Sequence, residues 1–164
     1  MPAEILDHVR DALPDTTHRV ARHTSSRVNS RLRDETEASV RRHARVSSRI
    51  DRRLAELDRE WDIERTLETN AALISLAGIG LAAFVDRRFL LLPAAVSAFL
   101  LQHAIQGWCP PVPVFRRRGV RTAAEIGAER TALKALRGDF DGVRSRGAED
   151  ADRAARDALR AALR

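Results

Sequence analysis

The chain has few of the residues that usually build a globular core or carry chemistry. Aromatic residues make up 4% of its 164 residues, and tyrosine is absent. A single cysteine, Cys109, excludes an intramolecular disulfide framework and a metal site built from several cysteines. The N-terminal stretch MPAEILDHVRDALPD contains acidic residues early and no apolar stretch of sufficient length, so we expect no signal peptide.

Charged residues are abundant but unevenly distributed. They make up 32% of the chain, and residues 1–68 and 116–164 are rich in Arg, Asp, Glu and Ala. The ionisable residues within 71–107 are Asp86, Arg87, Arg88 and His103. The pattern predicts an all-α membrane protein, in which a two-helix transmembrane hairpin lies between long charged cytoplasmic helical arms.

The net charge of +6 at pH 7 admits nucleic acid or an anionic membrane surface as a partner. However, most basic residues are arginines in close alternation with Asp and Glu, which is typical of a solvated helix with ion pairs along its surface. We therefore expect no nucleic-acid partner, and we keep a basic arm that binds anionic lipid or nucleic acid as an alternative.

The N-terminal arm, 1–68, is predicted to be helical. A short helix is expected over 2–13, and one long helix is expected over 16–65, which contains no proline and no glycine. Its weak apolar stripe comprises Val20, Val28, Leu32, Val46, Ile50, Leu54, Leu57 and Trp61.

A partial repeat lies within this arm. SSRVNSRL (25–32) returns as SSRIDRRL (47–54), an offset of 22 residues. Two 11-residue units would keep Val28 in line with Ile50 on one side of a helix, which favours a coiled pair with a partner helix. A helix lying on a membrane surface is the alternative.

Two apolar runs, NAALISLAGIGLAAFV and FLLLPAAVSAFLLQHAIQGW, are separated only by Asp-Arg-Arg. Each run approaches the ~20 residues of a typical transmembrane helix, and so short a linker permits only an antiparallel hairpin. A soluble, buried helix pair is the rival interpretation, but nothing else in the chain would cover two such apolar helices. We therefore predict a transmembrane hairpin over 69–109 in contact with the lipid bilayer.

Small residues recur at helical spacing in both runs. They are Ala71, Ser75, Gly78 and Ala82 in the first run, and Ala94 and Ala98 in the second. Small residues allow helix backbones to approach closely in lipid, so we predict helix packing and a homo-oligomer through the first of these faces.

Arginines set the expected orientation. Five precede the first run and five follow the second, whereas the turn has only Arg87 and Arg88. Both termini are therefore expected in the cytoplasm, with the hairpin in a bacterial inner membrane. A Pro/Arg juxtamembrane linker (110–121) leads to cytoplasmic C-terminal helices or a tail (122–164), where Thr122 and Glu125 fit a capping box and Gly138 fits a C-cap.

Few residues offer chemistry. His103 and Gln106 are polar groups inside the second span, where a hydrogen bond between helices is the simpler role and proton or metal handling is the alternative. Cys109 lies at the membrane border ahead of three arginines, whose charge would favour a reactive thiolate; simple packing is the alternative. We identify no catalytic, cofactor-binding or metal-binding residues and expect no cofactor.

A pair of motifs frames the hairpin: Glu64-Arg65 before the first span, and Gly107-Trp108-Cys109-Pro110 at the end of the second. On these motifs, residues 62–120 resemble the YgaP-type transmembrane hairpin family, bacterial inner-membrane modules of poorly defined function. The resemblance implies a hairpin that can self-associate. Some members carry a rhodanese, a sulfur-transfer domain, where this chain has charged arms, so no sulfurtransferase activity is expected.

The sequence leads us to expect a non-enzymatic inner-membrane hairpin protein whose cytoplasmic helical arms serve self-association or binding of a cytoplasmic protein partner. A membrane-tethered thiol or sulfur relay through Cys109 is the alternative from a different class.

Overall fold

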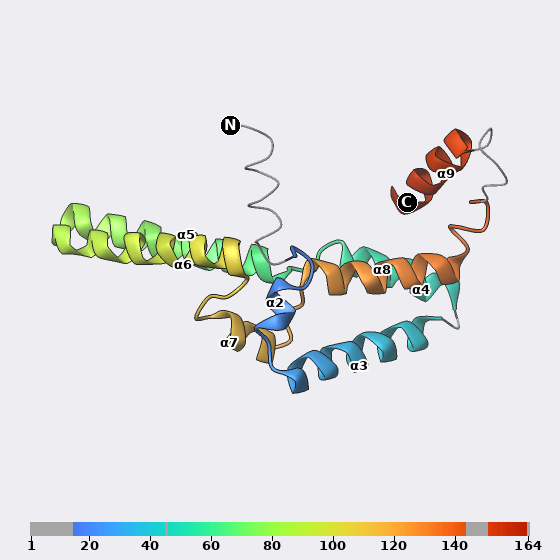
Figure 1. Cartoon of the computed structure of the whole chain (residues 1–164), viewed down its shortest axis with the longest axis horizontal. Coiled ribbons are helices and arrows are strands. Elements are labelled where there is room, and N and C mark those ends of the chain that lie inside the picture. Colours follow the sequence, from blue (N-terminus) through green and yellow to red (C-terminus); the bar gives the residue numbers. More distant parts are fainter. Residues whose placement is uncertain (1–14, 45, 144–150, 164) are drawn as a thin grey trace. The chain divides into compact units, whose positions relative to one another are not determined.

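The computed structural model describes residues 15–44, 46–143 and 151–163, and all regular secondary structure in these residues is helical (Figure 1). The predicted helix over 2–13 lies outside the described residues. The helices are α2 (Arg19–Arg22), α3 (Ser26–His43), α4 (Ser47–Leu57), α5 (Ile63–Phe84), the 3₁₀ helix η1 (Arg87–Leu90), α6 (Leu91–Gln106), α7 (Val112–Arg117), α8 (Ala123–Arg137) and α9 (Ala151–Leu163).

The chain forms two compact units, each assembled from segments that are distant in the sequence. Within the described residues, unit 1 comprises 15–32 and 61–123, and unit 2 comprises 33–60, 124–143 and 151–163. The N-terminal arm therefore contributes to both units rather than forming one of its own.

The arm is not the single long helix that its lack of proline and glycine predicted. It breaks between α2 and α3, between α3 and α4, and again before α5. At the first break the Thr24 hydroxyl donates to the Val20 carbonyl at 2.9 Å and the Asn29 amide donates to the Ala21 carbonyl at 2.8 Å. Such side-chain bonds compete with helical ones and end α2.

The later breaks have equally local causes. Val46 takes up an extended conformation directly before α4, and the Asp62 carboxylate caps α5 by accepting a hydrogen bond from the Arg65 amide at 2.8 Å. Because Val28 lies in α3 and Ile50 in α4, the 22-residue repeat does not form one stripe along a helix.

Helices α5 and α6 form an antiparallel hairpin, in which they lie side by side (Figure 1). Glu64 near the start of α5 contacts His103 near the end of α6, and Gly78 lies against Pro93. The turn is ordered by the Asp86 carboxylate, which accepts a hydrogen bond from the Arg88 amide at 2.7 Å. At ~1.5 Å per residue, the 22 residues of α5 extend far enough to cross a hydrocarbon core of about 30 Å.

The small-residue face of α5 packs within the chain. Ala71 and Gly78 are buried, and Ser75 and Ala82 are half-buried, because this face turns toward α6. This face therefore serves packing between α5 and α6 within the chain, and its use between two copies stays a prediction. On α6, Ala94 and Ala98 are exposed, and the half-buried positions are Pro93, Val96, Leu100 and Gln102.

The hairpin ends in a way that the sequence analysis did not foresee. Gly107, with a left-handed φ of 76°, caps α6, so α6 stops before the prolines rather than because of them. Pro111 is the N-cap of α7 and Pro113 lies in its first turn, where proline's fixed φ is favourable. Part of the predicted linker is thus a short helix that begins at its prolines.

The core of unit 1 lies at the open end of the hairpin, which is the end opposite the turn at Arg87–Leu90. It comprises Val20 of α2, Ile63 and Leu67 of α5, Cys109, and Val112 of α7, with Phe115 and Val120 packed against it. Full burial of such aliphatic side chains contributes about 1.5–3 kcal/mol each. This core holds α2 and α7 to the hairpin.

Unit 2 has its own core, in which Ile50, Leu54 and Leu57 of α4 contact Ile126 and Leu133 of α8. The predicted C-cap is confirmed: Gly138, with φ 86°, follows the last residue of α8. Within the C-terminal segment, residues 151–163 form the helix α9. The Lys134 ammonium donates to the Ala162 carbonyl at 2.7 Å, and this positive charge stabilises the C-terminal end of α9.

The hairpin contact predicts opposite effects at two neighbouring glycines. A Cβ at residue 78 would lie 2.8 Å from Pro93 Cδ, whereas a Cβ at residue 80 would have no described atom within 4 Å. We expect Gly78→Ala to destabilise the hairpin by about 1–3 kcal/mol through overpacking. Gly80→Ala should be neutral or stabilising by up to about 1 kcal/mol through helix propensity. Thermal unfolding in detergent, followed by circular dichroism, measures both; equal melting temperatures would contradict the contact.

Candidate functional site

Three ionisable side chains from three helices meet at the open end, or base, of the hairpin. We call Arg19, Glu64 and His103 the base cluster because of this location. The guanidinium of Arg19 in α2 lies 2.9 Å from Oε1 of Glu64 in α5, and Nε2 of His103 in α6 lies 2.8 Å from Oε2. Arg19 also donates to the carbonyl of Ala104 at 2.7 Å. One carboxylate therefore bridges two groups that lie 45 and 39 residues away along the chain.

The members of the base cluster differ in their exposure to solvent. The side chain of His103 is 4% exposed, that of Arg19 is 19% exposed and that of Glu64 is 32% exposed. Because an ionised carboxylate only accepts hydrogen bonds, Nε2 of His103 carries the proton between them. Among the described residues, Nδ1 of His103 and Nε of Arg19 are buried without a hydrogen-bond partner. The arrangement satisfies the Glu64 carboxylate and joins α2, α5 and α6.

Gly107 allows this arrangement by its lack of a side chain. A Cβ there would lie 2.6 Å from the backbone of Arg19, and the residue's φ of 76° is itself unfavourable for other residues. The structure thus brings together Glu64, His103 and Gly107, which the sequence analysis had named separately. The sequence analysis missed Arg19, because no local sequence pattern distinguishes this arginine from the other basic residues among the 29.

Cys109 lies in an apolar environment. It is 5% exposed and lines a pocket of about 250 Å³ together with Leu67, Ala71, Val96, Leu100 and Phe115. Burial raises the pKa of the Cys109 thiol above its ordinary value. The arginines that follow were expected to lower this pKa, but the shift is upward and its cause is burial.

Of those arginines, Arg116 turns inward. It is fully buried and donates to the Asn29 side-chain oxygen at 3.1 Å, the Thr24 hydroxyl at 3.3 Å and the Val120 carbonyl at 3.1 Å. Arg117 and Arg118 are exposed. Arg116 therefore contributes to the structure of unit 1 rather than to a cationic surface beside the thiol.

The remaining residues named from the sequence lie apart from the base cluster. Gln106 and Pro110 are exposed and Trp108 is half-buried. The guanidinium of Arg65 lies over the Trp61 ring, 4.3 Å from its centroid. This cation–π contact is worth about 0.5–1 kcal/mol at an exposed position.

Unit 2 contains a buried carboxylate that the sequence analysis missed. Glu129 is fully buried, accepts a hydrogen bond from the Ser39 hydroxyl at 2.5 Å and pairs with Arg53 at 2.9 Å. The bond to Glu129 raises the pKa of the Arg53 guanidinium further above its usual value. The paired charges join α3, α4 and α8, and we assign them a structural role.

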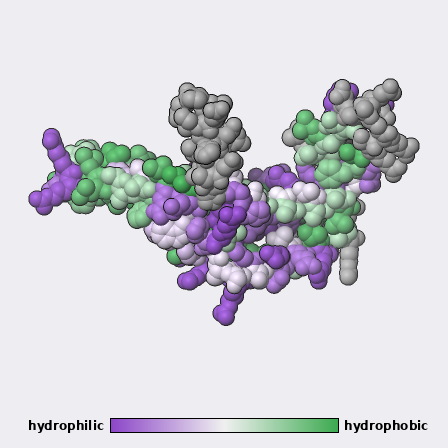
Figure 2. Space-filling model, in the orientation of Figure 1, coloured by the Kyte–Doolittle hydropathy of each residue, from purple (hydrophilic) through white to green (hydrophobic). Residues whose placement is uncertain are grey.

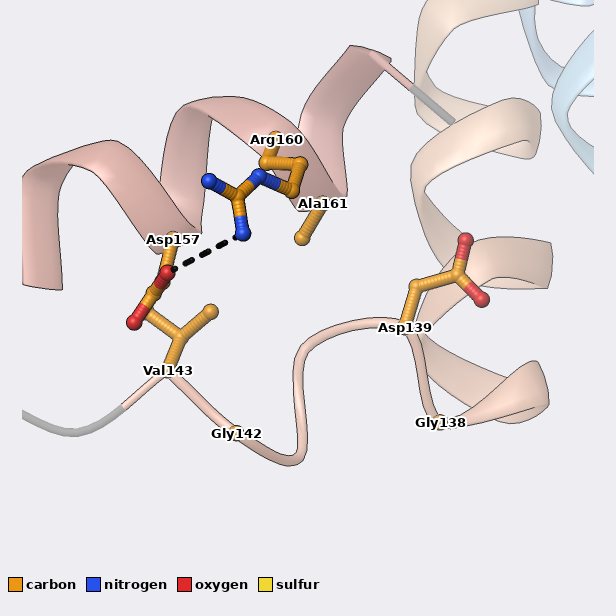
Figure 3. A pocket seen from close by; sticks show the side chains of 7 residues that line it. All are labelled: Gly138, Asp139, Gly142, Val143, Asp157, Arg160 and Ala161. Atoms are coloured by element: carbon orange, nitrogen blue, oxygen red, sulfur yellow. Dashed lines mark ion pairs between the residues drawn. The ribbon is translucent and has the colours of Figure 1, made fainter.

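A second hollow of about 240 Å³ lies in unit 2 between α9 and the turn that follows α8 (Figure 3). Its charged side chains are paired within the chain: Asp157 lies 3.9 Å from Arg160, and Asp139 lies 2.6 Å from Arg137. Across residues 15–44, 46–143 and 151–163, no group of three His, Cys, Asp or Glu side chains is arranged to hold a metal ion.

No family model, no curated protein and no solved structure matches this chain. The resemblance to a hairpin family therefore depends on the residues quoted for it alone.

Burial of the thiol predicts slow alkylation of Cys109. Below the raised pKa the reactive thiolate is a minor form, so the rate should increase about tenfold per pH unit and lie below that of a free thiol at every neutral pH. The rate of modification by iodoacetamide across a pH series measures this. The same chain unfolded in guanidinium chloride is the control, and faster alkylation of the folded chain would contradict the prediction.

The base cluster predicts that Arg19 holds α2 to the hairpin. Arg19→Met should weaken this attachment by about 1–3 kcal/mol, because charged hydrogen bonds to Glu64 and Ala104 are lost. Amide hydrogen exchange in α2 should become faster. Arg22→Met is the matched control, since Arg22 pairs with Asp15 at the surface, where an ion pair contributes about 0–1 kcal/mol. Equal exchange in both variants would show that Arg19 is not an anchor.

Proposed function

We propose that this chain is a non-enzymatic membrane protein whose α5/α6 hairpin spans a bilayer and anchors helical units for self-association or for binding a protein partner. The observation that carries the proposal is the outer surface of the hairpin, which is apolar and uncovered. Among the described residues, two helices are long and apolar enough to cross a membrane, Ile63–Phe84 and Arg87–Gln106.

The exposure of these helices favours a membrane over a soluble core. Only 17% and 6% of their most apolar windows are buried among the described residues, whereas the core helix of a soluble protein would be mostly covered. The exposed apolar side chains include Leu73, Leu76, Ile79, Phe84, Leu91 and Leu101. Figure 2 shows the hairpin as a largely hydrophobic surface. An apolar surface this extensive marks a site of membrane or protein contact.

The ionisable groups of the hairpin lie toward its two ends, as a spanning hairpin requires. The base cluster lies at the open end, and Asp86, Arg87 and Arg88 form the turn at the other end, which is hydrophilic in Figure 2. Charged groups at the interfaces avoid the cost of entering hydrocarbon. The excess of arginine beside the open end supports an orientation with both termini in the cytoplasm, and a bacterial inner membrane is part of the same proposal.

The described structure favours anchoring over the two alternatives. A thiol relay needs an accessible thiolate, and Cys109 is buried with a raised pKa. Of the arginines that could form a basic surface for nucleic acid or anionic lipid, Arg53, Arg130 and Arg137 of unit 2 are instead paired with Glu129, Asp58 and Asp51. Unit 2 instead exposes Leu136 and Leu159, which are available to a protein partner.

Membrane insertion can be tested with two pairs of matched substitutions. Leu76→Arg with Ile79→Arg places two charges near the middle of α5, at positions that are 66% and 50% exposed. Each arginine should oppose insertion by about 2.5–3.5 kcal/mol. We expect the parent chain to remain in the membrane pellet after alkaline carbonate extraction and the double variant to leave it.

The control is Leu136→Arg with Leu159→Arg in unit 2, where the side chains are 52% and 62% exposed and the charge change is the same. This variant should stay in the pellet like the parent. The proposal is overturned if carbonate releases the parent chain itself, or if both double variants behave alike.

A further inference from the structure

The pocket beside Cys109 has a distinctive lining. Its walls come from α5, α6 and the segment through α7, and its polar side chains are those of Asn70 and Cys109. The Asn70 amide already donates to the Thr66 carbonyl of its own helix at 2.7 Å. Ordered water needs two to four polar partners, which these walls do not supply, so the pocket suits an apolar occupant.

The pocket is large enough for such an occupant. Its volume of about 250 Å³ exceeds the ~150 Å³ of an apolar protein cavity that binds benzene. If the pocket were empty, the side chains around it would lack the dispersion contacts that a close-packed interior provides. The flanking helices are fixed by the base cluster and by the close approach at Gly78, so the pocket does not simply collapse.

The mouth of the pocket indicates which apolar ligand reaches it. Ile74 and Phe99 line the pocket and are 45% and 42% exposed, and both belong to the apolar surface of the hairpin. If that surface faces a bilayer, as the proposed function requires, the molecules at the mouth are lipid acyl chains. Resting on that function, we propose that the pocket between α5, α6 and α7 binds one acyl chain of a membrane phospholipid.

The location of Cys109 and Phe115 makes the proposal testable. Both line the pocket, yet both follow α6 and lie outside the two candidate spans. Cys109 is buried and Phe115 is half-buried, so lipids around the spans have little access to them except through the pocket. An acyl chain that contacts these residues is therefore in the pocket rather than in the general lipid shell.

The experiment uses the full chain in vesicles of phosphatidylcholine that carries a photoreactive diazirine within one acyl chain. After irradiation, tandem mass spectrometry maps the labelled residues. We expect labelling of Cys109 and Phe115 in addition to the exposed faces of the spans, such as Leu76. Ile74→Trp, which fills the mouth, should lower labelling of Cys109 and Phe115 several-fold and leave Leu76 labelled.

Leu73→Trp is the matched control, because Leu73 is the neighbouring residue, is 62% exposed and does not line the pocket. It should leave all labelling unchanged, and equal helicity by circular dichroism shows that both variants are folded. Labelling of Leu76 without Cys109 or Phe115 overturns the pocket while the membrane proposal stands. Equal loss in both tryptophan variants also overturns it. Absence of label from Leu76 as well means that the hairpin is not in lipid, and both proposals fail.

Discussion

The carboxylate of Glu64 determines how unit 1 is held together, because it is the shared partner of Arg19 and His103. Without it, an arginine and a histidine that are mostly shielded from solvent would each lose a charged or polar partner, at a cost well above that of a surface ion pair. Since the three groups come from α2, α5 and α6, one short side chain fixes the helix entering unit 1 against both helices of the hairpin. The glycine at position 107 is needed at the same point, because α2 passes where a side chain would otherwise lie.

The base cluster and the apolar hairpin depend on each other. Two helices with small residues between them need few specific contacts along most of their length, so their register is set where polar groups must pair. Two contacts are consistent with a single antiparallel register: that of Glu64 with His103 at the open end, and that of Gly78 with Pro93 further along the hairpin. A shift of one residue would separate the carboxylate from the imidazole and bring a larger side chain toward Pro93.

The sequence predicted the parts of this structure that depend on local pattern. The apolar runs, the tight turn and the C-cap at Gly138 were found because composition and spacing report on them directly. The long arm was misjudged because the absence of proline and glycine does not reveal side-chain bonds such as those of Thr24 and Asn29, which end α2. Arg19, Arg116 and Glu129 were missed because their partners are 45 to 92 residues away, and no local pattern marks which of many charges will be buried.

The position of Cys109 shows how burial can override a sequence pattern. Three arginines follow it closely, yet Arg116 is directed into unit 1 toward Thr24 and Asn29, and the thiol faces apolar side chains. Desolvation disfavours the thiolate and raises the pKa of Cys109, so the residue behaves as a small apolar group in the core of unit 1. In this environment, adjacent to an apolar pocket that opens on the hairpin surface, a cysteine is compatible with contact to hydrocarbon in a way that an exposed, ionised thiol would not be.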